Sequence, residues 1–182
     1  VAIERGREGT PHGWCVCARE QTEGRGRRGH VWASPAGSLY LSCVLRPGVR
    51  MQEFTALPAV CAMGVIDTLR ELGLAERVGI KWPNDIWVGD RKICGILIEN
   101  VLDAEMVSSS IVGIGLNVNE TSWPSELPNP VSMRQLTGKE YALDAELEEL
   151  GRELAKKYAL LGTAEGRAQL DSEFNRSMFR LP

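Results

Sequence analysis

A short segment at residues 24–29 combines three arginines with three glycines in the order GRGRRG. Arginine side chains donate forked hydrogen bonds that suit phosphate and carboxylate oxygens, and glycines let the backbone approach a ligand closely. One interpretation is a lid that closes over a phosphorylated ligand, and a solvated surface loop is the alternative. The segment is not a Walker P-loop, because no Gly-Lys-Ser/Thr follows and no helix is expected to begin there.

A second group of polar residues lies at residues 81–85, with the sequence KWPND. Pro83 favours a turn, so that Lys81, Asn84 and Asp85 can face a single pocket. A lysine neutralises phosphate charge, and a carboxylate can hold Mg²⁺ or orient a nucleophilic amine. The alternative is a surface turn in which the asparagine and aspartate only cap the backbone.

Two further segments combine glycines with a polar residue inside apolar strands. Lys92 begins an apolar strand, and Gly95 leaves space above the sheet. The segment GIGLNVN at residues 113–119 has paired glycines that favour close approach to a ligand, with Asn117 as a polar contact. An exposed charge at a strand end and tight sheet packing are the alternatives.

The elements that must position these groups follow from the spacing of apolar residues and turn residues. The opening segment to Gly13 is predicted to be the end of a helix, and residues 22–38 and 120–132 are predicted loops. We expect strands over 14–20, 39–45, 78–82, 86–88, 93–101 and 107–118, and helices over 53–72, 143–161 and 164–178. Gly89-Asp90 is a hairpin signal. The spacing therefore favours an α+β fold with a mixed, mostly antiparallel sheet flanked by helices.

Composition limits the classes of protein that are compatible with the chain. It has 182 residues, which suits a single domain, and 43% hydrophobic and 25% charged residues are ordinary for a soluble globular protein. A formal net charge of −3 argues against a chain that coats nucleic acid. No apolar run approaches the roughly 18 residues that a membrane span requires.

The five cysteines include no Cys-x-x-Cys pair, and the two histidines lie far apart in sequence, so no zinc site is expected. Cys15 and Cys17 would share one face of a strand, and we expect them to be buried free thiols. Reduced cysteines of this kind are typical of a cytoplasmic protein.

Taken in order, the motifs resemble those of the biotin protein ligase family. That family has a strand ending in glutamine, a GRGRRG-type loop, a tryptophan, KWPND, a lysine eleven residues after the first, a glycine three beyond it, and a GIGxNV strand. The matching positions are Gln21, residues 24–29, Trp32, residues 81–85, Lys92, Gly95 and residues 113–118. The resemblance covers residues 14–119 and implies the fold of class II aminoacyl-tRNA synthetases and biotin synthetases.

The resemblance implies an ATP-dependent ligase, a biotin–[acetyl-CoA-carboxylase] ligase. Such enzymes convert biotin and MgATP to biotinyl-5′-AMP, and then transfer biotin to a lysine of a biotin carboxyl carrier domain of acetyl-CoA carboxylase or a related carboxylase. Related enzymes include monomers and dimers, so a homodimer stays open. No nucleic-acid or membrane partner is expected.

The resemblance also implies roles for individual residues, and no metal site made by the protein alone. The catalytic residues would be Lys92, Arg27 and Asp85. Substrate would be bound by Gln21, Gly24, Arg25, Arg27, Arg28, Trp32, Lys92 and Gly95. ATP would be contacted by Arg25, Arg28, Trp32, Asn84 and Asn117. Lys92 would meet the reacting carboxylate and α-phosphate, and Gly95 would make room for the biotin ring.

The family's Ser-Thr-Asn biotin-binding motif, its C-terminal SH3-like barrel and the N-terminal winged helix of its repressor members are not present in this sequence. We therefore expect residues 1–182 to form a single catalytic domain that is truncated at both ends. Three other functions remain as alternatives: a lipoate-protein ligase or octanoyltransferase, a non-catalytic biotin-binding module, and a nucleic-acid-binding protein that uses the basic loop.

Overall fold

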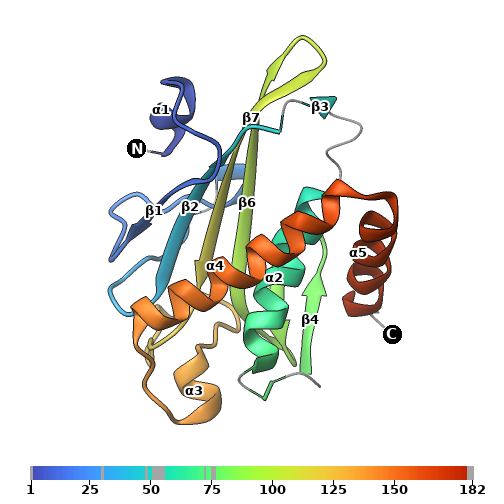
Figure 1. The fold of residues 1–182 in the computed structure, drawn as a ribbon. Coiled ribbons are helices and arrows are strands. Elements are labelled where there is room, and N and C mark those ends of the chain that lie inside the picture. The colour runs from blue at the N-terminus through green and yellow to red at the C-terminus, as the bar shows by residue number, and fades with distance from the viewer. Residues whose placement is uncertain are drawn as a thin grey trace.

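One antiparallel sheet organises the chain, and the computed structural model describes residues 2–29, 31–47, 49–50, 56–71, 73–74 and 77–179 (Figure 1). Six strands lie in the order β1-β2-β7-β6-β5-β4, and β3 also pairs with β7. The strands are β1 (Trp14–Ala18), β2 (Leu39–Leu45), β3 (Val49–Arg50), β4 (Val78–Lys81), β5 (Asp85–Val88), β6 (Arg91–Asp103) and β7 (Met106–Leu116). The named strands that the structure describes pair antiparallel throughout, as the hairpin spacing predicted.

Helices cover one face of this sheet in two layers (Figure 1). Helix α2 lies against β4, β5 and β6, and both α4 and α5 pack on α2. The helices are α1 (Ala2–Arg7), α2 (Leu57–Glu71), α3 (Met133–Thr137), α4 (Leu143–Ala159) and α5 (Ala164–Ser177). Short 3₁₀ turns lie at Arg27–Gly29, between β1 and β2, and at Leu160–Gly162, between α4 and α5. Helix α1 instead contacts β2 and β7, where Gly6 meets the side chain of Ile111.

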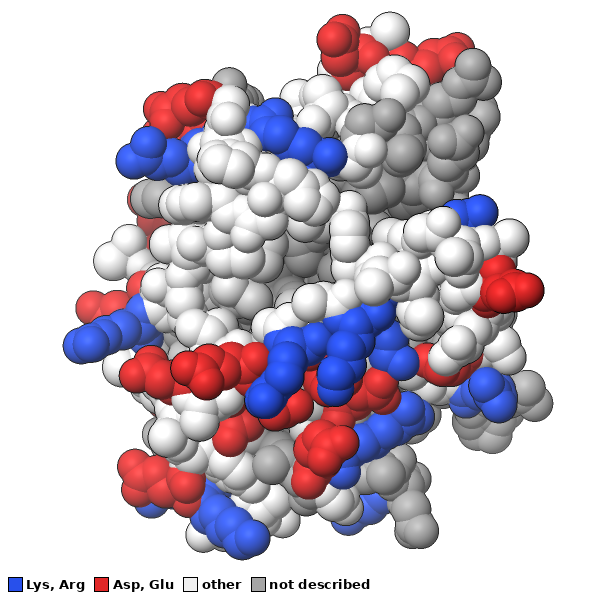
Figure 2. Space-filling model, in the orientation of Figure 1, with Lys and Arg blue, Asp and Glu red and all other residues white. Residues whose placement is uncertain are grey.

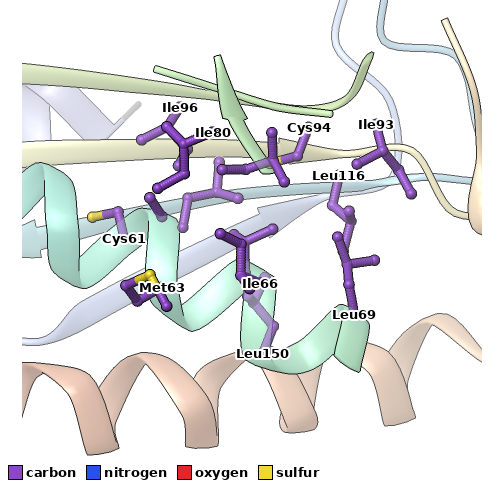
Figure 3. Close-up of a cluster of buried hydrophobic side chains, with 14 of the residues drawn as sticks. Cys61, Met63, Ile66, Leu69, Ile80, Ile93, Cys94, Ile96, Leu116 and Leu150 are labelled. Atoms are coloured by element: carbon purple, nitrogen blue, oxygen red, sulfur yellow. The ribbon is translucent and has the colours of Figure 1, made fainter. Parts of the chain in front are cut away.

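The hydrophobic core lies between the sheet and α2, with α4 closing its far side (Figure 3). Ile66 and Leu69 of α2 are fully buried between Leu116 of β7 and Leu150 of α4. Removing such apolar side chains from water is the main favourable contribution to folding. The face of the sheet that lacks α2 is therefore left for other contacts.

A β-bulge in β6 decides which side chains reach that other face. Asp85 pairs with Gly95 and Trp87 pairs with Lys92. Between these two pairs, β6 therefore contains one more residue than β5. The extra residue is Ile93, and both it and Cys94 are fully buried in the core. Because of this shift, Lys92 lies on the same face as Gly95.

Most of the expected elements are confirmed. The Gly89-Asp90 turn joins β5 to β6, and the two long C-terminal helices are present. Of the helix expected over 53–72, α2 spans Leu57–Glu71, and residues 53–55 and Leu72 lie outside the described part of the chain. Strand β3 and helix α3 were not expected. Within the described residues, no helix is both long and apolar enough to cross a membrane.

The expectation that Cys15 and Cys17 are buried is wrong. Both side chains are exposed, because β1 is an edge strand and the α2 layer lies over β4, β5 and β6 at the other side of the sheet. Cys61 and Cys94, which face the core, are buried as free thiols. Burial raises the pKa of Cys61 to about 12.

An ion-pair network joins the three helices that cover the sheet. Lys157 of α4 lies 2.8 Å from Asp67 of α2 and 2.7 Å from Glu173 of α5. Burial alone would lower the pKa of Lys157, but hydrogen bonds to the two carboxylates raise it overall. Burial would likewise raise the pKa of Glu173, but hydrogen bonds from Gln169 and Lys157 lower it overall. The stabilisation from Glu173 is therefore present at neutral pH and is lost as the pH falls through its folded-state pKa.

Replacing Lys157 with methionine keeps the aliphatic stem but leaves the two carboxylates without their cation. We expect the free energy of unfolding at neutral pH to fall by about 2 kcal/mol, a typical value for hydrogen bonds to charged groups. Urea unfolding followed by circular dichroism measures it. Lys139→Met is the matched control, since Lys139 is exposed and makes no ion pair within the described residues. Equal stability of the two variants would contradict a stabilising network.

Candidate active site

The indole of Trp32 lies against two glycines that face each other across neighbouring strands. Gly95 of β6 pairs with Gly115 of β7. A Cβ atom at Gly95 would lie 2.8 Å from the indole, and one at Gly115 would lie 2.6 Å from it. Real Cβ atoms do not approach so closely, so any larger residue would displace the ring. The two glycines thus form the floor of a hollow over the sheet, and Trp32 occupies it.

The indole N–H of Trp32 is buried and has no hydrogen-bond partner among the described residues. A buried donor without a partner costs about 1–3 kcal/mol. A ligand that brings an acceptor to this point, or that moves the ring towards water, would remove this cost. The position of Trp32 is therefore suited to rearrangement when a ligand binds.

The bulge in β6 brings Lys92 to the same hollow. Its Nζ atom lies 2.8 Å from Oδ1 of Asp85 and 5.0 Å from the centroid of the Trp32 ring. The two charged side chains are 27% and 23% exposed, so their attraction is screened less than that of a fully solvated pair. A cation held beside an aromatic ring and a glycine floor is suited to receive an anionic ligand group.

The basic loop is tied to the sheet through two of its arginines. Arg27 donates to Oδ1 of Asn84 at 3.4 Å, and Arg25 lies 3.3 Å from the carboxylate of Glu99. Asn84 is itself fixed to β6, because it donates to the carbonyl of Ile96 at 2.8 Å and accepts from the amide of Ile96 at 2.9 Å. The loop therefore lies over the face that carries Gly95 and Lys92.

Hydrogen bonds join the two ends of this loop, residues 21–24 and 32–34, which together form its neck. The backbone N–H of Gln21 donates to the carbonyl of Ser34 at 3.0 Å, and the Ser34 hydroxyl donates to Oε1 of Gln21 at 2.8 Å. Trp32 donates from its backbone to Gly24 at 2.9 Å. A Cβ at Gly24 would lie 2.1 Å from the carbonyl oxygen of Trp32, so only glycine fits there. The neck thereby sets the position of Trp32 over the sheet.

Most of the predicted site residues thus come together, but some do not. Asn117 is buried and donates to the carbonyls of Val131 and Lys92, so it fastens the strand ends to the loop before α3. Lys81 pairs with Asp85 across β4 and β5, and its Nζ atom lies over the ring of Trp87, 3.9 Å from the ring centroid. The side chain of Arg28 lies outside the described part of the chain.

The sequence did not identify two residues that hold the basic loop in place, Ser34 and Glu99. Each is a single polar residue whose role depends on a contact distant in sequence, with Glu99 lying 74 positions from Arg25. Glu99 does have one local signal, because it follows Gly95 and Leu97 at alternate positions and so falls on the same strand face. Ser34 has none.

The oxygen atoms near Lys92 are compatible with a metal ion that arrives with a phosphate ligand. Asp85 and the side-chain carbonyl of Asn84 provide such atoms, and Mg²⁺ commonly takes one or two carboxylates together with substrate phosphates. No cluster of three or more metal-binding side chains occurs within the described residues. On the helix-covered face, a small group of basic side chains near the middle is bordered by acidic side chains (Figure 2).

The sequence profile of the biotin/lipoate A/B protein ligase family matches residues 4–119. A biotin–[acetyl-CoA-carboxylase] ligase of Paracoccus denitrificans is 38% identical over 156 residues, which cover 81% of this chain and 64% of that protein. The bifunctional ligase/repressor BirA of Bacillus subtilis is 36% identical over 143 residues, which cover 76% of this chain and 44% of BirA. The chain thus spans under half the length of this relative.

The fold is likewise similar to that of a solved structure. The biotin protein ligase of Aquifex aeolicus, in complex with biotin and ATP, superposes with a TM-score of 0.83 at 28% sequence identity. The superposition covers 99% of this chain and 75% of that one. The sheet and its helical layer are therefore arranged as in that protein.

Replacing Gly115 with alanine places a methyl group where the Trp32 ring lies. We expect the indole to shift and the tryptophan fluorescence spectrum to change, and we expect that change to vanish in a Trp32→Phe background. Gly113→Ala is the matched control on the same strand and face, because its Cβ would lie 3.6 Å from its nearest neighbour, an ordinary contact. The contact would be refuted by a Gly115→Ala spectrum that equals that of Gly113→Ala.

Proposed function

Because the chain belongs to the biotin/lipoate A/B protein ligase family, we propose that it activates biotin with ATP and transfers it to a lysine of a carrier protein. The observation that carries this proposal is the hollow itself. It combines a glycine floor for an apolar ring with a partly buried lysine, a carboxylate and an arginine-rich loop. The similarity to a named biotin ligase over 81% of the chain supports biotin as the acid.

In the first half-reaction, a carboxylate oxygen of biotin attacks the α-phosphorus of ATP and pyrophosphate leaves. Two anions must approach each other, so the protein has to neutralise charge and hold the reactants in line. Lys92 is the group best placed to do this, because its ammonium lies beside the glycine floor. Its bond to Asp85 holds it there until an anionic ligand takes over the contact.

Asp85 and Asn84 are the residues that would hold Mg²⁺ against the ATP phosphates, where the ion shields their negative charge. Asn84 also receives Arg27 and is anchored to β6 at Ile96. This anchoring fixes Arg27 next to the phosphates once the loop closes. Arg25 would serve the same ligand from the other side of the loop, where Glu99 holds it.

Trp32 and the loop separate the product of this step from water. The mixed anhydride biotinyl-5′-AMP is prone to hydrolysis, and a closed loop excludes the attacking water. When biotin takes the floor of Gly95 and Gly115, the Trp32 ring moves aside and packs next to the nucleotide. This movement also releases the indole N–H from its unpaired position.

In the second half-reaction, the neutral ε-amine of the carrier lysine attacks the biotinyl carbonyl carbon. The bond between that carbon and the phosphate oxygen breaks, AMP leaves, and the amine loses a proton as the amide forms. Asp85 is the carboxylate that would orient the incoming amine. We place the reaction in the cytoplasm, which the five free thiols support.

Two measurements test this function. The chain is incubated with MgATP and either biotin or lipoate, and pyrophosphate release is followed. Labelled biotin is then offered together with a biotin carboxyl carrier domain. Biotin-dependent release and labelling of the carrier are expected. Pyrophosphate release with lipoate but not with biotin would show that lipoate is the substrate. Binding of biotin without pyrophosphate release would indicate a non-catalytic module.

Replacing Lys92 with alanine removes the proposed charge from the reacting centre. We expect biotin-dependent pyrophosphate release to fall by about 10²–10³-fold, as for other groups that stabilise developing charge, while circular dichroism stays unchanged. Arg91→Ala is the control, because Arg91 pairs with Val88 and lies on the core side of β6. Near-normal release by the Lys92 variant would refute its assignment.

Replacing Arg27 with alanine breaks the tie between the loop and Asn84. We expect biotinyl-5′-AMP to dissociate roughly 10-fold faster or more, which corresponds to the loss of one hydrogen bond to a charged group. Trapping of released biotinyl-5′-AMP over time measures this rate. Arg19→Ala, an exposed arginine at the start of the same loop, is the control. An unchanged rate in the Arg27 variant would exclude its role in the lid.

A further inference from the structure

Two cysteines face each other directly across the pairing of β1 with β2. Cys15 and Cys43 are register partners, and their Sγ atoms lie 2.8 Å apart as free thiols. Directly opposed residues of antiparallel strands have Cα atoms about 4.5 or 5.5 Å apart. Disulfides span Cα separations of about 4.4–6.8 Å. The backbone therefore already has a spacing that a disulfide accepts.

The environment of the pair differs from that of the other thiols. Cys15 is exposed and Cys43 is half-buried, so that a small molecule reaches Cys15 more readily than Cys43. A hydrogen bond with Cys43 lowers the pKa of Cys15 to about 7, despite partial burial. The same contact, together with burial, raises the pKa of Cys43. Cys15 is thus the nucleophile of the pair, since the thiolate is the reactive form.

The position of the pair connects it to the ligand loop. Strand β1 lies at the edge of the sheet, and within the described ladder it pairs only with β2. The ladder ends at Ala18 and Tyr40, three positions from the cysteines, and the segment between these two residues carries Arg27 and Trp32. Edge strands open locally more easily than central ones, so a covalent link here would act on the base of the loop.

We propose that Cys15 and Cys43 form a thiol-modification site that a small-molecule disulfide oxidises to an intramolecular disulfide, which clamps β1 onto β2 beneath the ligand loop. The site is separate from the hollow that contains Lys92 and Trp32, because Cys43 packs against the hydrophobic core on the helix-covered face of the sheet and Cys15 lies opposite it in register. Its chemistry does not depend on the proposed ligase reaction.

The reaction balances with oxidised glutathione as the oxidant. The Cys15 thiolate attacks one sulfur of glutathione disulfide, forms a mixed disulfide and releases one glutathione thiolate. Cys43 then loses its proton and attacks the Cys15 sulfur, so that the Cys15–Cys43 bond forms and the second glutathione leaves. The protein loses two protons and two electrons, and the oxidant gains them. A dithiol reductant reverses the reaction.

The test is intact-mass measurement of the whole chain after treatment with oxidised glutathione. We expect the wild type to lose the mass of two hydrogens, reversibly, and to yield one cross-linked peptide that contains Cys15 and Cys43. The Cys15→Ser and Cys43→Ser variants should not show this loss of mass. Cys17→Ser is the matched control, because Cys17 is exposed on the same face of the same strand but pairs with Leu41, and it should behave as wild type.

Hydrogen exchange tests the clamp itself. On oxidation, we expect the amides of β1 to exchange roughly tenfold more slowly, because the link suppresses local opening of the edge strand. Those of β4, at the other end of the sheet order, should be unchanged. The proposal is overturned by an unchanged wild-type mass, by a stable glutathione adduct in place of the cross-link, by oxidation that persists in Cys43→Ser, or by unaltered exchange in β1.

Discussion

The extra residue in β6 is the constraint on which the rest of the site depends. A regular strand would place Lys92 and Cys94 on one face, because side chains alternate. The bulge at Ile93 instead buries both Ile93 and Cys94 in the core and turns Lys92 to the opposite face. A single change of register thus puts the apolar side chains of this stretch in the core and its lysine on the opposite face of the sheet. Without it, an ammonium group would face the hydrophobic core, which has no water to solvate it.

With Lys92 on the open face, the remaining contacts form a self-consistent set. Each cation that the structure describes in the hollow and its loop meets a protein acceptor: Lys92 meets Asp85, Arg25 meets Glu99, and Arg27 meets Asn84. These pairs hold the loop over the sheet, and they also define what an anionic ligand must displace. The attraction between each pair is weak enough to exchange, because all of these side chains keep contact with water.

The glycine floor and the tryptophan show how packing and rearrangement are combined. Gly95 and Gly115 create the space, and the Trp32 ring occupies it at the cost of an unpaired N–H. The loop that carries Trp32 starts from an edge strand, which has a single neighbour in the described ladder. The cysteine pair lies at the base of this loop, which is why a covalent link there would reach the site through the backbone.

The amino-acid sequence by itself determined the succession of most strands and helices along the chain, a mostly antiparallel sheet and the chemistry-bearing segments. Those features depend on local periodicity, on turn residues such as Gly89-Asp90 and on contiguous motifs at residues 24–29 and 81–85. Only the tertiary structure decided which face Lys92 occupies, that Asn117 fastens loops, that Lys81 lies over Trp87, and that Ser34 and Glu99 hold the basic loop. It also decided that Cys15 is exposed opposite Cys43. Each of these depends on register, on strand position within the sheet or on contacts far apart along the chain. Apart from the alternate spacing that puts Glu99 on the same face as Gly95, none of them leaves a periodic trace in the sequence.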